Sequence, residues 1–103
     1  MITEIVTFPL PAGCDREGAL KLYRQTAEKW ASNTDLVRKY YFFDKERCLG
    51  GGVYIWRSQD AAVRWHGDDY RNMVRSLYGA SPEISIFDVV IDVDPTSGSV
   101  TEL

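Results

Sequence analysis

The sequence predicts one α+β domain, in which four strands form an antiparallel sheet and two helices cover one face of it. Three observations lead to this prediction. Strand-like and helix-like segments follow one another in the order βαββαβ, and a polar loop, DKER, joins the second and third strands along the chain. The chain has 103 residues, 45% of them hydrophobic, which suffices for one core and not for two. We expect the domain over residues 1–94 and a loose polar tail at 95–103.

The first strand and the first helix follow from residues 2–35. Residues 2–8 (ITEIVTF) alternate as a strand does, and the prolines at 9 and 11 end it because proline cannot continue a ladder. Asp15 is a suitable N-cap for the next helix, since its carboxylate can accept from free amide groups of the first turn. The polar stretch SNTD at 32–35 ends this helix. Its apolar stripe consists of Leu20, Tyr23, Ala27 and Trp30.

A hairpin, an interrupted helix and a last strand complete the domain. Residues 36–43 (LVRKYYFF) and 48–56 (CLGGGVYIW) are predicted strands, joined by the loop at 44–47. Ser58 caps a short helix that Gly67 interrupts. Asp68 caps its continuation, and Gly79 is a C-terminal glycine cap. Residues 83–93 (EISIFDVVIDV) form the last strand. Two helical crossovers and one hairpin are typical of the ferredoxin-like arrangement.

The last strand also predicts a homodimer. It is apolar on both faces, and such a strand needs cover on both sides of its sheet. The two helices can cover only one side. A second copy of the same sheet is the simplest cover for the other side, so we expect a two-fold dimer that forms a dimeric α/β barrel.

Composition and charge exclude several classes of function. The net charge is −3 and the 12 lysines and arginines are scattered, which disfavours nucleic acid because phosphate binding needs a clustered basic face. No apolar stretch approaches the ~20 residues of a membrane span, and MITEIVTFPLP lacks the features of a secretory leader. Cys14 and Cys48 are therefore expected to be free thiols in the cytoplasm. With one histidine and no ligand cluster, no metal site is expected.

Three consecutive glycines, at 50–52, stand inside a predicted strand, although glycine weakens strands. If residues 43 and 48 pair, Tyr41 lies opposite Gly50, and Lys39 lies opposite Gly52 on the same face. Positions without side chains beside aromatic rings would leave a hollow for a ligand. The opposite face would then pack on the helices. An aromatic ring over a glycine, a β-bulge or a close dimer contact would also explain the glycines.

A small organic molecule is the expected occupant of this hollow. His66 can act there as a general acid or base, or it can be a helix C-terminal residue favoured by the helix dipole. Lys39 can hold an anionic or enolate oxygen, or it can form a salt bridge. The aromatic residues can equally be plain core. The predicted substrate-binding residues are Tyr41, Gly50, Gly52, Tyr54, Trp56, Trp65 and Tyr70.

Two stretches carry a family resemblance, RKYYFFDKERCLGGGVYIWRSQDAA at 38–62 and YGASPEISIFDV at 78–89. In them the chain resembles the YdhR-like family of small bacterial mono-oxygenases. That family belongs to the dimeric α/β-barrel proteins, together with the antibiotic-biosynthesis mono-oxygenases. The resemblance extends from Ile2 to Val93. It implies a ferredoxin-like protomer, a dimer whose sheets face each other, and a pocket in each protomer.

The resemblance also implies an activity, the oxygenation of aromatic or polyketide-like substrates without metal, flavin or other cofactor. The substrate is deprotonated to a carbanion or enolate that reacts directly with oxygen, which requires a base and an oxyanion donor. Lys39, Trp56 and His66 are placed in that pocket, with Lys39 and His66 as the catalytic residues. Two alternatives stay open, a dimer that binds a small ligand without catalysis, and a haem-binding or haem-degrading relative with His66 as axial ligand.

Overall fold

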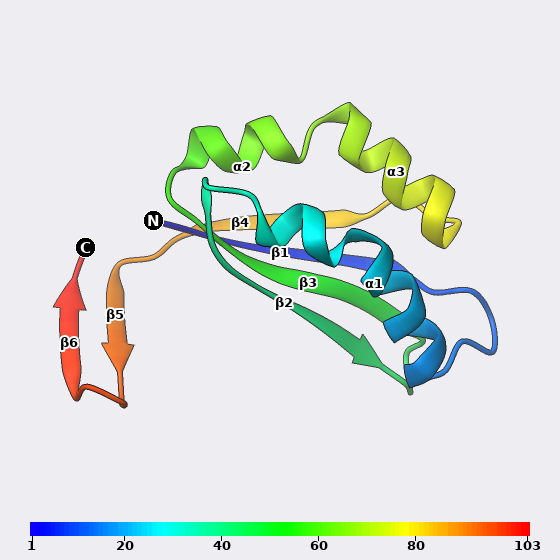
Figure 1. Cartoon of the computed structure of the whole chain (residues 1–103), viewed down its shortest axis with the longest axis horizontal. Coiled ribbons are helices and arrows are strands. Elements are labelled where there is room, and N and C mark those ends of the chain that lie inside the picture. Colours follow the sequence, from blue (N-terminus) through cyan, green and yellow to red (C-terminus); the bar gives the residue numbers. More distant parts are fainter.

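Four strands form one antiparallel sheet in the computed structural model, which describes residues 1–103. They are β1 (Ile2–Pro9), β2 (Leu36–Asp44), β3 (Leu49–Trp56) and β4 (Glu83–Asp88), in the spatial order β2-β3-β1-β4. Helices α1 (Arg16–Ala31), α2 (Gln59–Trp65) and α3 (Asp68–Tyr78) lie over one face of the sheet (Figure 1). The predicted ferredoxin-like α+β class is confirmed, with the interrupted second helix present as α2 and α3.

The helix boundaries follow from capping residues. The Asp15 carboxylate accepts a hydrogen bond from the Gly18 amide at 2.8 Å at the start of α1. Ser58 does the same for the Ala61 amide at 3.1 Å at the start of α2. Gly79 ends α3 with φ at 85°, a left-handed conformation that glycine adopts readily. The aspartate at 68 is not a cap but the first residue of α3. No helix combines the length and apolar character that a membrane crossing requires.

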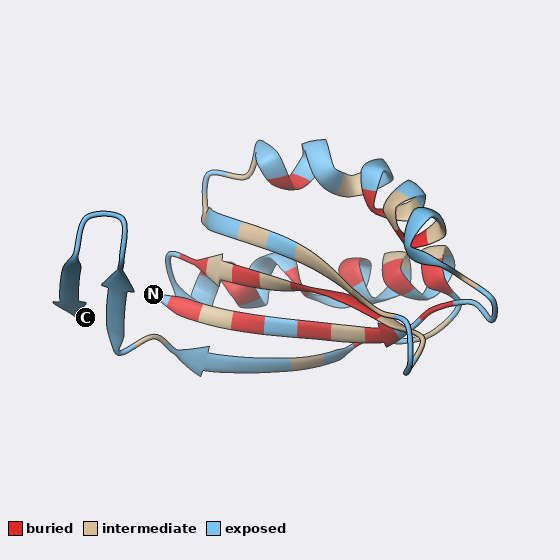
Figure 2. Cartoon of the chain, turned by 90° about the horizontal axis from the view of Figure 1, so that it is seen from below, coloured by how far each residue is buried: buried red, intermediate tan, exposed pale blue.

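The core lies between the sheet and the helices. On β1 every second side chain from Ile2 to Phe8 is buried, and the charged Glu4 is among them. Helix α1 contributes Tyr23 and Trp30 to the same layer. In Figure 2 the buried residues concentrate on the central strands and on parts of the helices. The other buried hydrophobic residues are Val6, Leu10, Ala19, Tyr54, Trp56, Ala61, Ala62, Tyr70, Val74 and Tyr78.

The β2–β3 hairpin has a different register from the predicted one. Tyr41 pairs with Gly52 rather than with Gly50, and Lys39 pairs with Tyr54. The difference amounts to two residues. Because side chains alternate with a period of two, the residues from Arg38 to Trp56 share faces as predicted, although their direct cross-strand partners change.

The prediction of which hairpin face packs on the helices is wrong. The face with the lysine and the large aromatic rings lies against the helices, while Tyr40, on the other face, is 56% exposed. The irregular pairing of the hairpin lies between Leu36 and Arg38 at its open end, so no bulge occurs at the glycines. The glycines therefore have a different structural role, described below.

The C-terminal region departs most from prediction. The strand predicted over 83–93 stops at Asp88, and β5 (Ile91–Asp94) follows after a break. The tail predicted to be loose contains β6 (Ser99–Glu102), which pairs antiparallel with β5. Asp94 fixes the turn by accepting hydrogen bonds from the amide and hydroxyl of Thr96. This hairpin stands apart from the sheet (Figure 1) and is exposed along its length (Figure 2).

Candidate functional site

The first glycine of β3 makes room for a tyrosine of α1, and the second makes room for the backbone of β1 and the ring of Phe42. A Cβ atom at Gly50 would collide with the Tyr23 hydroxyl. This hydroxyl donates a hydrogen bond to the Phe42 carbonyl at 2.7 Å and accepts one from the Gly51 amide at 3.2 Å. Gly50 thus lets the Tyr23 side chain of α1 bind the hairpin backbone directly.

The third glycine makes room for Lys39. A Cβ atom at Gly52 would lie 3.1 Å from Cε of the lysine, so the lysine stem occupies the space over this position. The predicted open hollow is therefore wrong in this structure. What remains between sheet and helices is a cavity of about 10 Å³, about the volume that one water needs. Its walls are formed by Phe8, Thr26, Trp30, Lys39, Tyr41, Gly51, Tyr54, Tyr70, Met73, Val74 and Tyr78.

The amine of Lys39 lies among three aromatic faces. Nζ is 3.7 Å from the ring centroid of Tyr41, 4.3 Å from that of Tyr54 and 4.7 Å from that of Trp30. It takes part in none of the four ion pairs of the chain, so the expected alternative of a salt bridge is wrong. Burial, helped by the charge of Lys29, lowers the pKa of the Lys39 amine to about 6. At neutral pH the free amine is therefore well populated.

A surface groove opens beside Lys39. Its volume is about 290 Å³, close to the lower end of the ~300–1,000 Å³ range of small-molecule sites. Trp30, Lys39 and Tyr41 line both the groove and the inner cavity. Lys39 thus stands at the boundary between an open groove and a closed interior. The remaining groove residues are Ala27, Ala31, Asn33, Leu36, Val37 and Arg38.

A buried polar cluster lies deeper in the core. Glu4 is fully buried, and its Oε1 accepts a hydrogen bond from Trp56 Nε1 at 2.8 Å. The same oxygen contacts Nδ1 of His66. The geometry of that contact is not that of a hydrogen bond. Both ring nitrogens of His66 and the second carboxylate oxygen of Glu4, Oε2, therefore have no hydrogen-bond partner. Burial lowers the pKa of His66, and the neighbouring carboxylate only partly opposes the shift. The imidazole is therefore mainly neutral at pH 7.

Two tyrosines separate His66 from the cavity. The imidazole stacks on Tyr70 with ring centroids 3.9 Å apart and meets Tyr54 edge-on at 4.4 Å. The two tyrosine hydroxyls lie 3.2 Å from each other, and burial raises the pKa of both phenols, so they are neutral at physiological pH. Both tyrosines line the cavity, whereas His66 and Trp56 do not. The predicted base therefore lies one layer behind the cavity wall.

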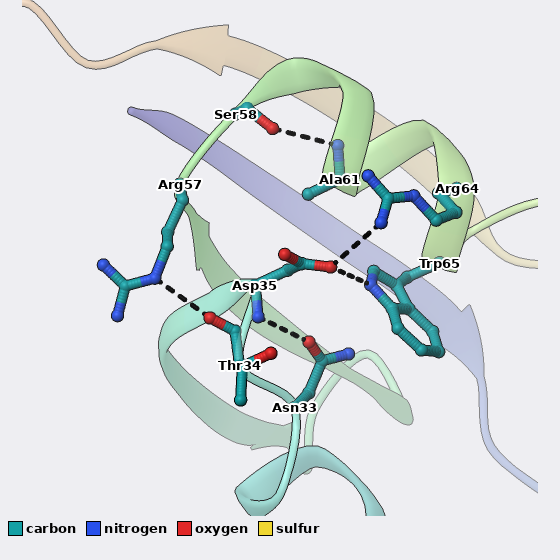
Figure 3. Close-up of polar contacts among 8 residues, drawn as sticks. All are labelled: Asn33, Thr34, Asp35, Arg57, Ser58, Ala61, Arg64 and Trp65. Carbon is teal, nitrogen blue, oxygen red and sulfur yellow. Dashed lines mark hydrogen bonds and ion pairs between the residues drawn. The ribbon is translucent and has the colours of Figure 1, made fainter.

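Trp65 lies apart from the other predicted site residues. It is 38% exposed, and its Nε1 donates a hydrogen bond to Asp35 Oδ2 at 3.0 Å (Figure 3). Arg64 donates to the same oxygen at 3.3 Å, and Arg57 Nε donates to the Thr34 carbonyl at 3.0 Å. Arg57 thus binds the start of α2, and Arg64 and Trp65 bind its end, to the loop between α1 and β2. The structure therefore gives Trp65 a role in positioning α2, away from the cavity.

The structure thus brings together part of the predicted site. Among the glycines, Gly51 lines the cavity, while the space beside Gly50 and Gly52 is occupied by neighbouring side chains. The predicted residues that line the cavity are Lys39, Tyr41, Tyr54 and Tyr70.

Sequence reasoning missed three residues of this region. Trp30 and Thr26 reach the cavity from α1, where the Thr26 hydroxyl lies 2.6 Å from that of Tyr41. Trp30 belongs to the apolar stripe of α1, which by itself indicates only core, and Thr26 lies outside that stripe and carries no signal in the sequence. Glu4 had a clearer signal, because it occupies an inward position between Ile2 and Val6 in an alternating strand.

The side chains show no arrangement typical of a metal or haem site. No three His, Cys, Asp or Glu side chains gather as metal ligands would, and Cys14 and Cys48 are free, partly exposed thiols. His66 is enclosed by aromatic rings, so a haem cannot reach its Nε2 without displacing them. The enclosing rings are Trp30, Tyr54, Trp56 and Tyr70.

Solved structures of other proteins share this fold. SnoaB, a cofactor-independent oxygenase from Streptomyces nogalater, has a TM-score of 0.61 at 16% identity, with 85% of this chain and 91% of that chain covered. A monooxygenase of Streptomyces coelicolor in complex with nanaomycin D has a TM-score of 0.67 at 17% identity, with 91% of each chain covered. A conserved protein from Methanosarcina mazei has a TM-score of 0.64 at 12% identity, covering 84% of this chain and 89% of that chain.

Comparison of the sequence itself gives no match. No protein-family model matches the chain, and no curated protein matches it. The likeness to the three solved structures, at identities of 12% to 17%, extends over most of each chain. It establishes that this chain has the fold of these proteins, and the function has to be argued from the site itself.

Proposed function

We propose that this chain is a cytoplasmic, homodimeric mono-oxygenase of the YdhR-like kind, which acts on a small aromatic or polyketide-like substrate without a cofactor. The observation that carries the proposal is the unpaired amine of Lys39, held among three aromatic faces at the edge of a groove. Two proteins with this fold are a cofactor-independent oxygenase and a monooxygenase with bound nanaomycin D. Their activities support the same class of reaction here.

The groove is the proposed substrate site. Its volume of about 290 Å³ suits a flat molecule of one or two rings. Trp30 and Tyr41 offer ring faces for stacking, and such aromatic pairs contribute ~0.5–1.5 kcal/mol beyond area burial. A larger polyketide-like substrate would need Lys39 and Tyr41 to move, because the cavity behind them holds only about 10 Å³.

Lys39 is the proposed base and oxyanion partner. As a free amine it takes the acidic proton of the substrate, and as the resulting ammonium it stabilises the phenolate or enolate beside it. The electron-rich carbon then gives electrons to O₂, a C–O bond forms, and a hydroperoxide results. Loss of water from that hydroperoxide leaves a carbonyl, so the substrate is oxidised and one oxygen atom leaves as water.

His66 has an indirect role in this proposal. It stacks on Tyr70, and Tyr70 and Tyr54 line the cavity. Through these contacts we expect it to position the two phenols of the inner cavity wall, behind Lys39. Glu4 and Trp56 hold the imidazole from the far side.

The dimer part of the proposal is supported by uncovered apolar surface. On the sheet face away from the helices, Ile5, Tyr40 and Phe87 are between 36% and 56% exposed. The β5–β6 hairpin adds Val93 and Val100, each more than 60% exposed. Exposed apolar patches on a protein surface mark interaction sites, and a second copy is the partner that the two-sided apolar strand predicts.

Oxygen uptake tests the proposed activity. Wild-type protein is incubated with a panel of dihydroxy-aromatic compounds and anthrones, and oxygen consumption and product mass are measured. Lys39→Met is expected to lower the rate by ~10²–10⁴-fold, the usual contribution of a general base. Lys45→Met, in the exposed β2–β3 turn, is the matched control and should retain the wild-type rate.

The same assay separates the second candidate, a dimer that binds ligands without turnover. Ligands that raise the melting temperature of wild-type protein without any oxygen uptake would favour that function, because ligand binding to the native state stabilises it by mass action. Turnover that persists unchanged in Lys39→Met would contradict the proposed mechanism.

A further inference from the structure

We propose that Lys39 is a nucleophilic amine that condenses with aromatic aldehydes or ketones entering through the groove, so that the site forms a reversible imine. This inference concerns the same side chain as the proposed function and rests on it for the location of the site. It adds a covalent chemistry and a class of ligand, the aromatic carbonyl compounds. Three features of the surroundings support it: the access, the lack of a counter-ion and the ring faces.

Access comes from the groove. Lys39 lines both the groove of about 290 Å³ and the inner cavity of about 10 Å³. A carbonyl carbon can therefore approach Nζ from the groove, while the interior side is closed. Most groove residues are hydrophobic, which favours an aromatic carbonyl compound over a sugar.

The charges that face Lys39 favour the free amine. Helix α1 presents Lys29, whose positive charge opposes a second one nearby. Strands β2 and β3 present Tyr41 and Tyr54, which are uncharged, and His66 follows α2 and is itself affected by the Lys39 charge. No carboxylate lies within ion-pair distance of the amine. Burial without a counter-ion is the usual environment of lysines that form Schiff bases.

The three ring faces favour the protonated amine, because aromatic faces attract a cation, and so they partly offset the effect of burial on Lys39. Their effect is to keep both forms accessible near neutral pH, which imine formation requires. The free amine must attack the carbonyl, and a protonated group must help water to leave. The Tyr41 hydroxyl, which lies 2.6 Å from that of Thr26 and belongs to a groove residue, can carry this proton.

The reaction balances without any oxidant or reductant. The nitrogen lone pair attacks the carbonyl carbon, a C–N bond forms, and the electron pair of the C=O bond moves to oxygen, which takes up a proton. The carbinolamine then loses its hydroxyl group as water, and nitrogen loses its proton as the C=N bond forms. Hydrolysis by a water molecule reverses both steps.

Reductive trapping tests this inference. Wild-type protein is treated at pH 7 with benzaldehyde and sodium cyanoborohydride, and benzylated lysines are identified by peptide mass spectrometry. An amine with a pKa near 6 is mostly free at pH 7, whereas an exposed lysine with a pKa of ~10.4 is free to less than ~0.1%. Lys39 should therefore carry at least about tenfold more label than any other lysine. The other lysines are Lys21, Lys29 and Lys45.

Controls make the result specific. Lys39→Arg keeps a cation but cannot form the imine, so the preferential label should disappear, while Lys45→Arg should leave it unchanged. The α-amino group of Met1 serves as an internal reference, since its pKa of ~7.7–8.0 also makes it reactive. Labelling of Lys39 should fall by half near pH 6 in wild-type protein.

Equal labelling of all four lysines, or labelling of Lys39 only above pH 9, would overturn the inference. The outcome is distinguishable from that of the oxygenase test. Trapping at Lys39 without oxygen uptake would support the imine site and refute the proposed oxygenase. Oxygen uptake without trapping would support the oxygenase and refute the imine site.

Discussion

At the scale of single residues, Lys39 is the most unusual feature of the molecule, because lysine is seldom placed in a core without a partner. Its amine has aromatic faces instead of a carboxylate. Such a placement lowers stability, because the folded chain must either release a proton or bury a charge. Sites that reduce stability in this way are often the sites of function.

The cost of this placement depends on pH in a calculable direction. The pKa of Lys39 is about 6 in the folded chain and 10.5 as its ordinary value. Between these values the unfolded state binds more protons, so stability rises with pH across the window from about 6 to 10.5. Below about pH 6 the full penalty is present, and above 10.5 it has vanished.

Replacing Lys39 by Met should therefore stabilise the protein while it removes activity. Methionine has a similar length and no charge, so we expect a gain of ~1–3 kcal/mol in the free energy of unfolding at pH 7. The gain should shrink as the pH approaches 10.5. Urea unfolding of both proteins at pH 6, 8 and 10 measures this, with the exposed Lys45→Met as control. A gain that is the same at every pH would mean that Lys39 stays charged in the folded chain.

At the scale of elements, the contact between α1 and β3 holds the site together. Tyr23 reaches across from the helix, and its hydroxyl bonds the Phe42 carbonyl and the Gly51 amide. The hydroxyl fits only because Gly50 has no side chain. The helix that carries Trp30 is thereby fixed relative to the strand that carries Tyr54.

A double-mutant cycle tests this contact. Gly50→Ala should cost ~1–3 kcal/mol, because the new methyl group collides with the Tyr23 hydroxyl. Tyr23→Phe should cost ~1–3 kcal/mol, because the buried Phe42 and Gly51 backbone groups lose their partner. The double variant should cost less than the sum, since Tyr23→Phe removes the oxygen that the methyl group strikes.

The control for this cycle is Gly67→Ala. A Cβ atom there would meet only the Val63 carbonyl at 3.9 Å, an ordinary contact distance. Its effect should therefore add to that of Tyr23→Phe within ~0.5 kcal/mol. Strict additivity in the Gly50 cycle as well would show that the glycine is needed for some other reason.

Much of the element order could be predicted from the sequence, because its signals are local. Asp15 and Ser58 cap their helices by bonding amides three residues away, and β1 alternates residue by residue. Which face of the β2–β3 hairpin meets the helices depends on Tyr23, which lies far from the hairpin in sequence. No local pattern carries that information.

The candidate site was harder to predict for the same reason. The sequence places Lys39 beside aromatic residues but does not decide between that setting and a salt bridge, and residue type alone places Glu4 at the surface, although it is fully buried. Glycines suggested a hollow, but whether space beside a glycine stays open depends on the side chains that reach it. Here those are Tyr23 and Lys39.

At the scale of the whole molecule, the two faces of the sheet differ sharply. One is covered by three helices, and the other is bare (Figure 1). The β5–β6 hairpin has no other strand to pair with, and an isolated two-stranded hairpin is marginally stable in water. Its exposed Val93 and Val100 pair with each other. Both features are accounted for if a second copy packs against the bare face and the hairpin.

A substitution on the bare face should therefore change the oligomeric state. Phe87 is 54% exposed on β4, paired with Thr3 of β1 on the face away from the helices. Phe87→Asp would place a charge in an apolar interface, where it has no partner, and such a buried charge costs several kcal/mol. Light scattering after size exclusion should then show a dimer for wild-type protein and a monomer for the variant.

Val63→Asp is the matched control for this experiment. Val63 is 61% exposed on α2, on the helix layer, so the same kind of change there should leave the dimer intact. The melting temperature of wild-type protein should also rise with protein concentration, because a dimer is favoured by mass action, while that of Phe87→Asp should not. A wild-type chain that runs as a monomer at every concentration would refute the dimer, and the bare sheet face would then need a different partner.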